Sequence, residues 1–158
     1  METLSKAKAA LKAISVFFYS MVGGLLMFTI IIFVMSYFQP PPIADKSVFK
    51  TIFIVVLFMS ALSLSAATWL YRKRIATAQS SDLALMDKLN IYRAALMLYL
   101  ALCEAPGLFA AIIYFLTGNQ LLLVVIALIL IAMFLKRPEK SKIFNELQLN
   151  SQEQLELN

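Results

Sequence analysis

Glu104 has the clearest chemical potential in this chain, because it is the one charged side chain in a long apolar stretch. It is the eleventh of the 24 residues in the apolar run 94–117. A carboxylate at the centre of a membrane helix costs about 2.5–3.5 kcal/mol. In lipid such a carboxyl is protonated and neutral unless water or a cation reaches it. A group that can change between these two states is what proton or cation binding requires, so the position predicts an ion-binding role.

Small side chains surround Glu104 on one face of its expected helix. Ala101, Gly107 and Ala111 lie at intervals of three or four residues along this face. Small residues allow a second helix to approach closely, so we expect a neighbouring backbone beside the carboxyl.

Pro106 is expected to supply a hydrogen-bond acceptor near the carboxyl. It has no N–H, and it therefore leaves the carbonyl of Leu102 without its helical donor. A protonated Glu104 could donate to this carbonyl. The Ser- and Ala-rich second half of the preceding apolar run is the expected opposing surface, with Ser63 and Ser65 as supporting residues.

Two other roles for Glu104 stay open. In the first, the protonated carboxyl hydrogen-bonds to a hydroxyl or carbonyl of the same chain and only fixes helix packing. In the second, it contacts a partner subunit in the membrane. We expect Tyr99, Tyr114 and Cys103, in the same run, to be packing residues.

The composition indicates that lipid is the solvent for most of the chain. Of its 158 residues 61% are hydrophobic and 15% are charged, with a mean hydropathy of +0.82. A soluble domain of this size could not bury so much apolar surface. We predict an all-α membrane protein, an antiparallel bundle of four transmembrane helices in residues 1–138, followed by a polar cytoplasmic tail in residues 139–158. The expected helices cover residues 13–38, 51–71, 94–117 and 120–136.

The basic residues predict that both termini are cytoplasmic. Twelve of the 14 Lys and Arg residues flank the runs on one side, and only Lys46 and Lys50 lie on the other. The positive side of a membrane protein faces the cytoplasm, and termini on the same side require an even number of crossings. The fourth run is short, so a re-entrant segment is the alternative to a fourth crossing. The strongest orientation anchors are Arg72, Lys73, Arg74, Lys136 and Arg137, with Lys136 expected to extend to the interface.

The polar segments carry weaker signals. Ser81 and Asp82 form a candidate helix N-cap, and the spacing of Leu83, Leu85, Met86 and Leu89 predicts a short amphipathic helix at the membrane surface. We expect the C-terminal tail to be solvated, with a weak helix or a docked segment as the alternatives.

Several function classes are disfavoured by the composition. The chain has no His and one Cys, which argues against a metal cluster, a structural disulfide, a bound cofactor and the usual nucleophilic sites. Asp45, Asp82 and Asp87 are scattered, so we do not expect an enzyme. The basic residues border apolar runs instead of forming a basic patch, so we do not expect nucleic-acid binding.

Residues 55–118 partly resemble the proteolipid (c) subunit of rotary ATP synthases, a hairpin of a small-residue helix, a basic loop and a helix carrying an ion-binding carboxylate. Arg93 precedes Glu104 by 11 residues, and the stretch 101–108, ALCEAPGL, is similar to the family's carboxylate motif. The resemblance implies that Glu104 carries the ion and that Ser63, Ser65 and Ala67 face it. Ser and Ala replace the family's glycine repeat, and the first and fourth runs have no counterpart in a two-helix hairpin.

Taken together, these features predict a small multi-pass protein of a bacterial cytoplasmic membrane. Its partners are the lipid bilayer and either further copies of itself or other membrane subunits. The favoured hypothesis is proton or cation binding at Glu104. The alternative is a structural or assembly subunit of a larger membrane complex.

Overall fold

A computed structural model of the chain describes residues 2–39, 41–42, 46–79, 83–149 and 154, and the side chains of residues 2–7, 46 and 47 lie outside this description. Within these residues the chain forms helices and no strand. The helices are α1 (Glu2–Phe38), α2 (Lys46–Gln79), α3 (Leu85–Thr117), α4 (Leu121–Leu135) and α5 (Lys140–Leu147).

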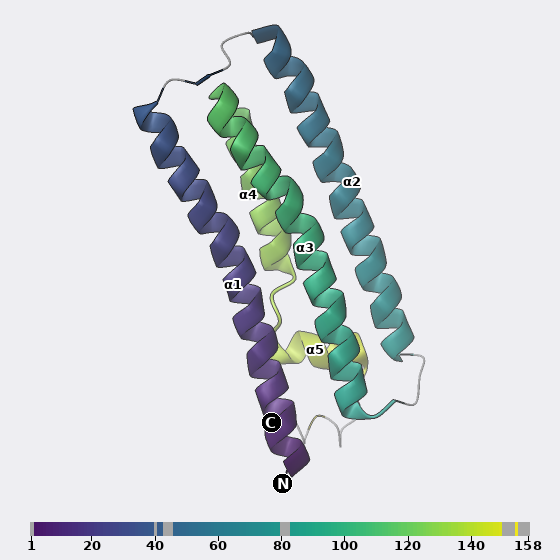
Figure 1. Cartoon of the computed structure of the whole chain (residues 1–158). Helices are drawn as coiled ribbons and strands as arrows, with labels where there is room; N and C mark the ends of the chain where they lie inside the picture. The colour runs from purple at the N-terminus through teal and green to yellow at the C-terminus, as the bar shows by residue number, and fades with distance from the viewer. Residues whose placement is uncertain (1, 40, 43–45, 80–82, 150–153, 155–158) are drawn as a thin grey trace.

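Helix α3 is the centre of the bundle. It makes the most extensive contacts with α2, followed by α1 and α4, whereas the other helix pairs touch only slightly. Successive helices run up and down, so α1 and α3 point in the same direction (Figure 1). The start of α1, the α2–α3 connection and α5 all lie at one end of the bundle, which we call the basic end because most Lys and Arg residues belong to it (Figure 1).

The outer surfaces of α1 and α2 are apolar. Phe38, Phe58 and Trp69 are examples of large side chains that remain more than half exposed. Three helices are long and apolar enough to cross a membrane, or four if the bent pair α4 and α5 counts as one span. The prediction of an all-helical membrane protein is thereby confirmed at this level.

The helices are longer than the apolar runs that predicted them. α1, α2 and α3 have 37, 34 and 33 residues, about 50–55 Å each at 1.5 Å per residue. Leu85, Met86 and Leu89 are the first turns of α3, so the prediction of a separate amphipathic helix was wrong. Once α3 has begun at Leu85, continuing its hydrogen-bond ladder adds a bond for each residue fixed. The candidate cap at Ser81 and Asp82 lies outside the described residues.

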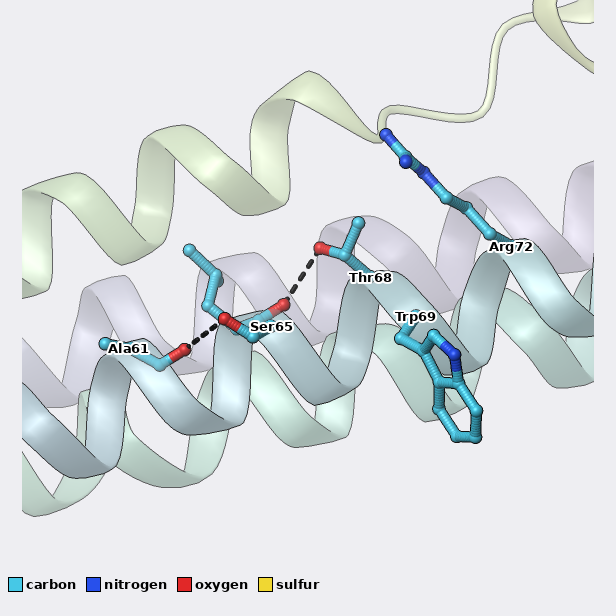
Figure 2. A pocket seen from close by; sticks show the side chains of 6 residues that line it. Ala61, Ser65, Thr68, Trp69 and Arg72 are labelled. Carbon is cyan, nitrogen blue, oxygen red and sulfur yellow. Dashed lines mark hydrogen bonds between the residues drawn. The ribbon is translucent and has the colours of Figure 1, made fainter.

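The outer face of α2 carries a shallow hollow of about 560 Å³ (Figure 2). Two hydroxyls line it, but each is already satisfied by its own helix: Ser65 donates to the carbonyl of Ala61 and Thr68 to that of Leu64, both at 2.8 Å. This polar half of α2 therefore presents no free donor to the hollow through these two residues.

Helix α4 is short, and α5 fills the end of the bundle that α4 does not reach. The axes of α4 and α5 differ by 73°, and α5 lies across the basic end of the bundle (Figure 1). Ile143, Leu147 and Leu149 are at most 5% exposed. The prediction of a solvated tail is therefore wrong for residues 140–149, because the apolar face of α5 is buried in the bundle.

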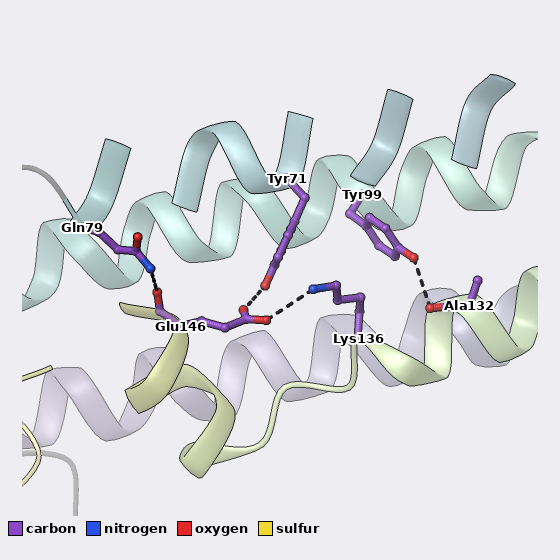
Figure 3. Close-up of polar contacts among 6 residues, drawn as sticks. All are labelled: Tyr71, Gln79, Tyr99, Ala132, Lys136 and Glu146. Carbon is purple, nitrogen blue, oxygen red and sulfur yellow. Dashed lines mark hydrogen bonds and ion pairs between the residues drawn. The ribbon is translucent and has the colours of Figure 1, made fainter. Parts of the chain in front are cut away.

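Glu146 holds α5 to the bundle (Figure 3). Its carboxylate lies 3.3 Å from Nζ of Lys136 and also accepts a hydrogen bond from the hydroxyl of Tyr71. Its backbone carbonyl accepts a hydrogen bond of 2.6 Å from the side chain of Gln79. Lys136 also lies 4.2 Å from the centre of the Tyr71 ring. Lys136 thus turns inward to Glu146 and Tyr71, which differs from the extension to the interface expected from the sequence.

We predict that Glu146→Gln loosens α5, because the variant loses the charge that pairs with Lys136. The expected cost is about 1 kcal/mol, since both side chains keep partial access to solvent. Hydrogen exchange of residues 140–149 should accelerate about fivefold. Glu139→Gln, which removes an exposed charge just before α5, is the matched control. Equal exchange in both variants would contradict the role given to Glu146.

Candidate functional site

The carboxyl of Glu104 lies against α1. A Cβ atom built on Gly24 would be 3.9 Å from Oε1 of Glu104. Because Gly24 has no side chain, the carboxyl can lie beside the backbone of α1. The expectation of a close neighbouring backbone is met, but the neighbour is α1, whereas the sequence suggested the Ser-rich half of α2.

Glu104 has no hydrogen-bond or ion-pair partner in the part of the chain that the structure describes. It is half-buried, so the carboxyl keeps an open side at the surface of the bundle. The neighbouring residues Gly24, Ala101 and Ala105 are exposed. We call Gly24, Ala101, Glu104 and Ala105 the Glu104 surface, a patch of small residues around one carboxyl at the junction of α1 and α3.

The carbonyl freed by Pro106 is occupied by a serine. The hydroxyl of Ser63 on α2 donates a hydrogen bond of 2.6 Å to the carbonyl of Leu102 on α3. The sequence correctly indicated that this carbonyl needs a donor, but the expected donor was Glu104. Ser63 takes that place because α2 packs on the opposite flank of α3 from the carboxyl. This leaves Glu104 without the intrahelical partner that would have made it a packing residue.

The other predicted site residues divide between the two flanks of α3 and the outside of α2. Gly107 and Ala111 are buried, whereas Ala101 is exposed. Ser65 is exposed and lies two residues, or about 200° of helix rotation, from Ser63. It therefore faces away from α3 (Figure 2). Ala67 is fully buried.

Residues near Glu104 that were expected to pack do so. Cys103 is a buried free cysteine, and Tyr99 and Tyr114 are at most 7% exposed. The hydroxyl of Tyr99 donates to the carbonyl of Ala132 on α4 at 3.2 Å (Figure 3).

The orientation anchors follow two patterns. Lys73 and Arg137 lie over the rings of Trp69 and Tyr19, at 5.2 and 5.7 Å from the ring centres. Such cation–aromatic pairs suit the boundary between membrane and water, where one end of the pair is apolar and the other polar.

Gly24 is the site residue that sequence reasoning did not connect to Glu104. The signal was present, because Gly23 and Gly24 interrupt the first apolar run near its middle, at a depth similar to that of Glu104 in the third run. What the sequence did not show was that α1 and α3 are neighbours.

The arrangement can hold a proton more readily than a metal cation. Hard cations such as Ca²⁺ take six to eight oxygen ligands. Within the described residues there is no group of three or more His, Cys, Asp or Glu side chains that could hold a metal ion. A proton needs only the carboxyl itself. A cation would require further ligands from a neighbouring molecule.

In comparisons with known proteins, no family model, no curated protein and no solved structure matches this chain.

We predict that Ser63→Ala destabilises the bundle by about 1–3 kcal/mol, because it leaves the carbonyl of Leu102 buried without a donor. Pro106→Ala restores a backbone N–H that can bond to the same carbonyl. In the Pro106→Ala background, Ser63→Ala should therefore cost much less. Unfolding in a denaturing detergent, followed by circular dichroism, measures both costs. Ser65→Ala is the control, and additive effects of the two substitutions would contradict the shared-acceptor account.

We predict that Gly107→Ala weakens the contact of α1 with α3. Its new Cβ would lie 2.9 Å from a terminal methyl group of Leu25, a side chain with no exposed surface. The cost should be about 1–3 kcal/mol, as for overpacking in other cores. Gly23→Ala is the matched control, since a Cβ there meets nothing within 4 Å. The same unfolding assay should show no loss for the control, and equal losses would count against the packing account.

Proposed function

We propose that this protein is a four-crossing membrane protein that associates through its Glu104 surface with another transmembrane helix, supplied by a second copy or by another membrane subunit. The observation that carries the proposal is the lone carboxyl of Glu104, half-exposed at mid-membrane depth and without a polar partner in the described chain. Ionisable residues in membranes almost always face a bundle interior or a water-filled cavity and pair with other groups.

The small residues around the carboxyl support a helix as the missing partner. Gly24, Ala101 and Ala105 add almost no side-chain bulk at the surface, so a second backbone could come close to the carboxyl. A protonated Glu104 would then donate a hydrogen bond to a carbonyl or hydroxyl of that helix. Interhelical hydrogen bonds of this kind contribute about 0.6–2 kcal/mol.

The charge distribution supports the four-crossing topology with cytoplasmic termini. The described Lys and Arg residues of the basic end greatly outnumber Lys50 at the other end. α4 alone is about 22 Å long and crosses a core of about 30 Å only with the residues that flank it. α5 then remains on the cytoplasmic side with the α2–α3 connection.

Proton binding at Glu104 is the second candidate function. The observation that favours it is the open side of the carboxyl, through which water or a partner's polar group could reach it. In this case the neutral and ionised forms alternate, which an association role does not require. The two functions predict different behaviour for Glu104→Gln, because glutamine imitates the protonated acid but cannot release a proton.

The test uses cysteine cross-linking of purified protein in liposomes, in a Cys103→Ser background. Ala101→Cys should form disulfide-linked dimers several times faster than Leu128→Cys, a control on the exposed side of α4. Glu104→Ala should weaken association about three- to thirtyfold, which corresponds to the loss of one interhelical hydrogen bond. Glu104→Gln should retain most of it. If the partner is another subunit, that subunit should instead copurify with the wild type and be lost with Glu104→Ala.

Outcomes of this experiment separate the candidates. Monomeric wild-type protein that recovers no partner in mild detergent would remove the association proposal. Carbodiimide labelling of Glu104, together with proton flux that Glu104→Gln abolishes, would establish proton binding. A protein unlabelled by carbodiimide, with a Glu104→Gln variant that is stable and unchanged in every assay, would remove proton binding.

A further inference from the structure

A groove of about 540 Å³ runs between α1 and the first turns of α3. Its outer half carries two basic side chains, Lys12 and Arg93, and its inner half is mainly apolar. The groove is lined by Ala9, Lys12, Ala13, Val16, Phe17, Ser20 and Arg93. It is separate from the Glu104 surface and uses none of its residues.

Lys12 and Arg93 lie at the same depth. α1 and α3 run in the same direction, and Gly24 is level with Glu104. Lys12 precedes Gly24 by twelve residues and Arg93 precedes Glu104 by eleven, which places each about 16–18 Å from mid-membrane at 1.5 Å per residue. Half of a hydrocarbon core is about 15 Å. Both charges therefore lie at the level where phospholipid phosphates begin.

The two residues mark the membrane boundary in the sequence as well. Lys12 is followed by residues 13–38, which contain no charged residue, and Arg93 is followed by ten uncharged residues before Glu104. From this boundary the groove continues inward past Val16, which is 61% exposed, and Phe17. A ligand that fits has an anionic group at the interface and a hydrocarbon chain pointing into the bilayer.

The positive charge of the groove is not offset by a carboxylate. Lys12 and Arg93 are exposed, and no carboxylate among the described residues forms an ion pair with either. Lys12 also borders a second pocket, of about 340 Å³, to which Lys8 and Lys140 contribute. The additional basic residues raise the local attraction for an anion at this end of α1.

We propose that this groove binds one anionic phospholipid, with its phosphate between Lys12 and Arg93 and one acyl chain along Val16 and Phe17. The arginine side chain donates paired hydrogen bonds to phosphate oxygens, and the lysine adds a point charge. The site selects anionic over zwitterionic phospholipids because a choline group would bring a positive charge to the same end. Its ligand is independent of the association proposed for Glu104.

The test uses full-length protein from liposomes of equal phosphatidylglycerol and phosphatidylcholine, extracted in mild detergent and analysed by native mass spectrometry. The wild type should retain one phosphatidylglycerol per chain. Each basic residue near a membrane surface contributes about 1 kcal/mol, or roughly fivefold, so Lys12→Gln with Arg93→Gln should lower this retention about thirtyfold. Arg74→Gln with Lys142→Gln removes two exposed charges from the same end outside the groove and should retain the lipid.

Val16→Trp provides a second variant that keeps both charges and fills the groove. It should also lose the retained lipid, and gel filtration with circular dichroism checks that each variant is folded. The proposal is overturned by equal retention of phosphatidylcholine in the wild type, by equal losses in the groove pair and the control pair, or by full retention in Val16→Trp. Displacement of the lipid by excess glycerol 3-phosphate would also overturn it, because a free phosphate would then satisfy the site.

Discussion

The hydrogen bond from Ser63 to the carbonyl of Leu102 is the interaction on which the arrangement of the bundle depends. Lipid offers no donors, so a carbonyl released by a proline must find one inside the protein. Ser60, Ser65 and Thr68 on the same helix donate to their own helix, four residues back. Ser63 instead reaches α3. It thereby fixes which face of α2 meets α3 and leaves the opposite flank of α3 to α1.

The parallel alignment of α1 and α3 follows on that opposite flank and sets the depth of the charged groups. Leu25 packs against Gly107, and Gly24 lies beside Glu104. With these positions matched, Lys12 and Arg93 come to the same level about eleven or twelve residues below. The same register therefore places one carboxyl at mid-membrane depth and two cations at the interface, and a shift of one helical turn would separate both pairs.

The sequence predicted those parts of the fold that depend on one segment alone. The long apolar runs around Ala13 and Ala94 predicted helices, and the proline in the third run predicted an acceptor in need of a donor. The sequence did not predict which helix supplies that donor, because Ser63 and Glu104 are both chemically suitable and only the packing of three helices decides between them. The docking of α5 was missed for a similar reason. Its apolar residues are few, and their burial depends on the space left where α4 ends.

The short α4 explains why the basic end contains a polar network while the middle of the bundle contains a lone acid. Phe134, near the end of α4, contacts Phe18, which lies six residues or about 9 Å inward of Lys12 along α1. α4 therefore ends below the membrane boundary, and the charge of Lys136 would be costly there without a partner. Glu146 on α5 supplies that partner, and Tyr71 adds a ring and a hydroxyl. The chain thus provides a counter-charge for Lys136 near the interface, where water could have served. It provides no partner for Glu104 at mid-membrane depth, where neither water nor lipid can serve, and a second helix is the kind of partner that fits the small-residue surface around the carboxyl.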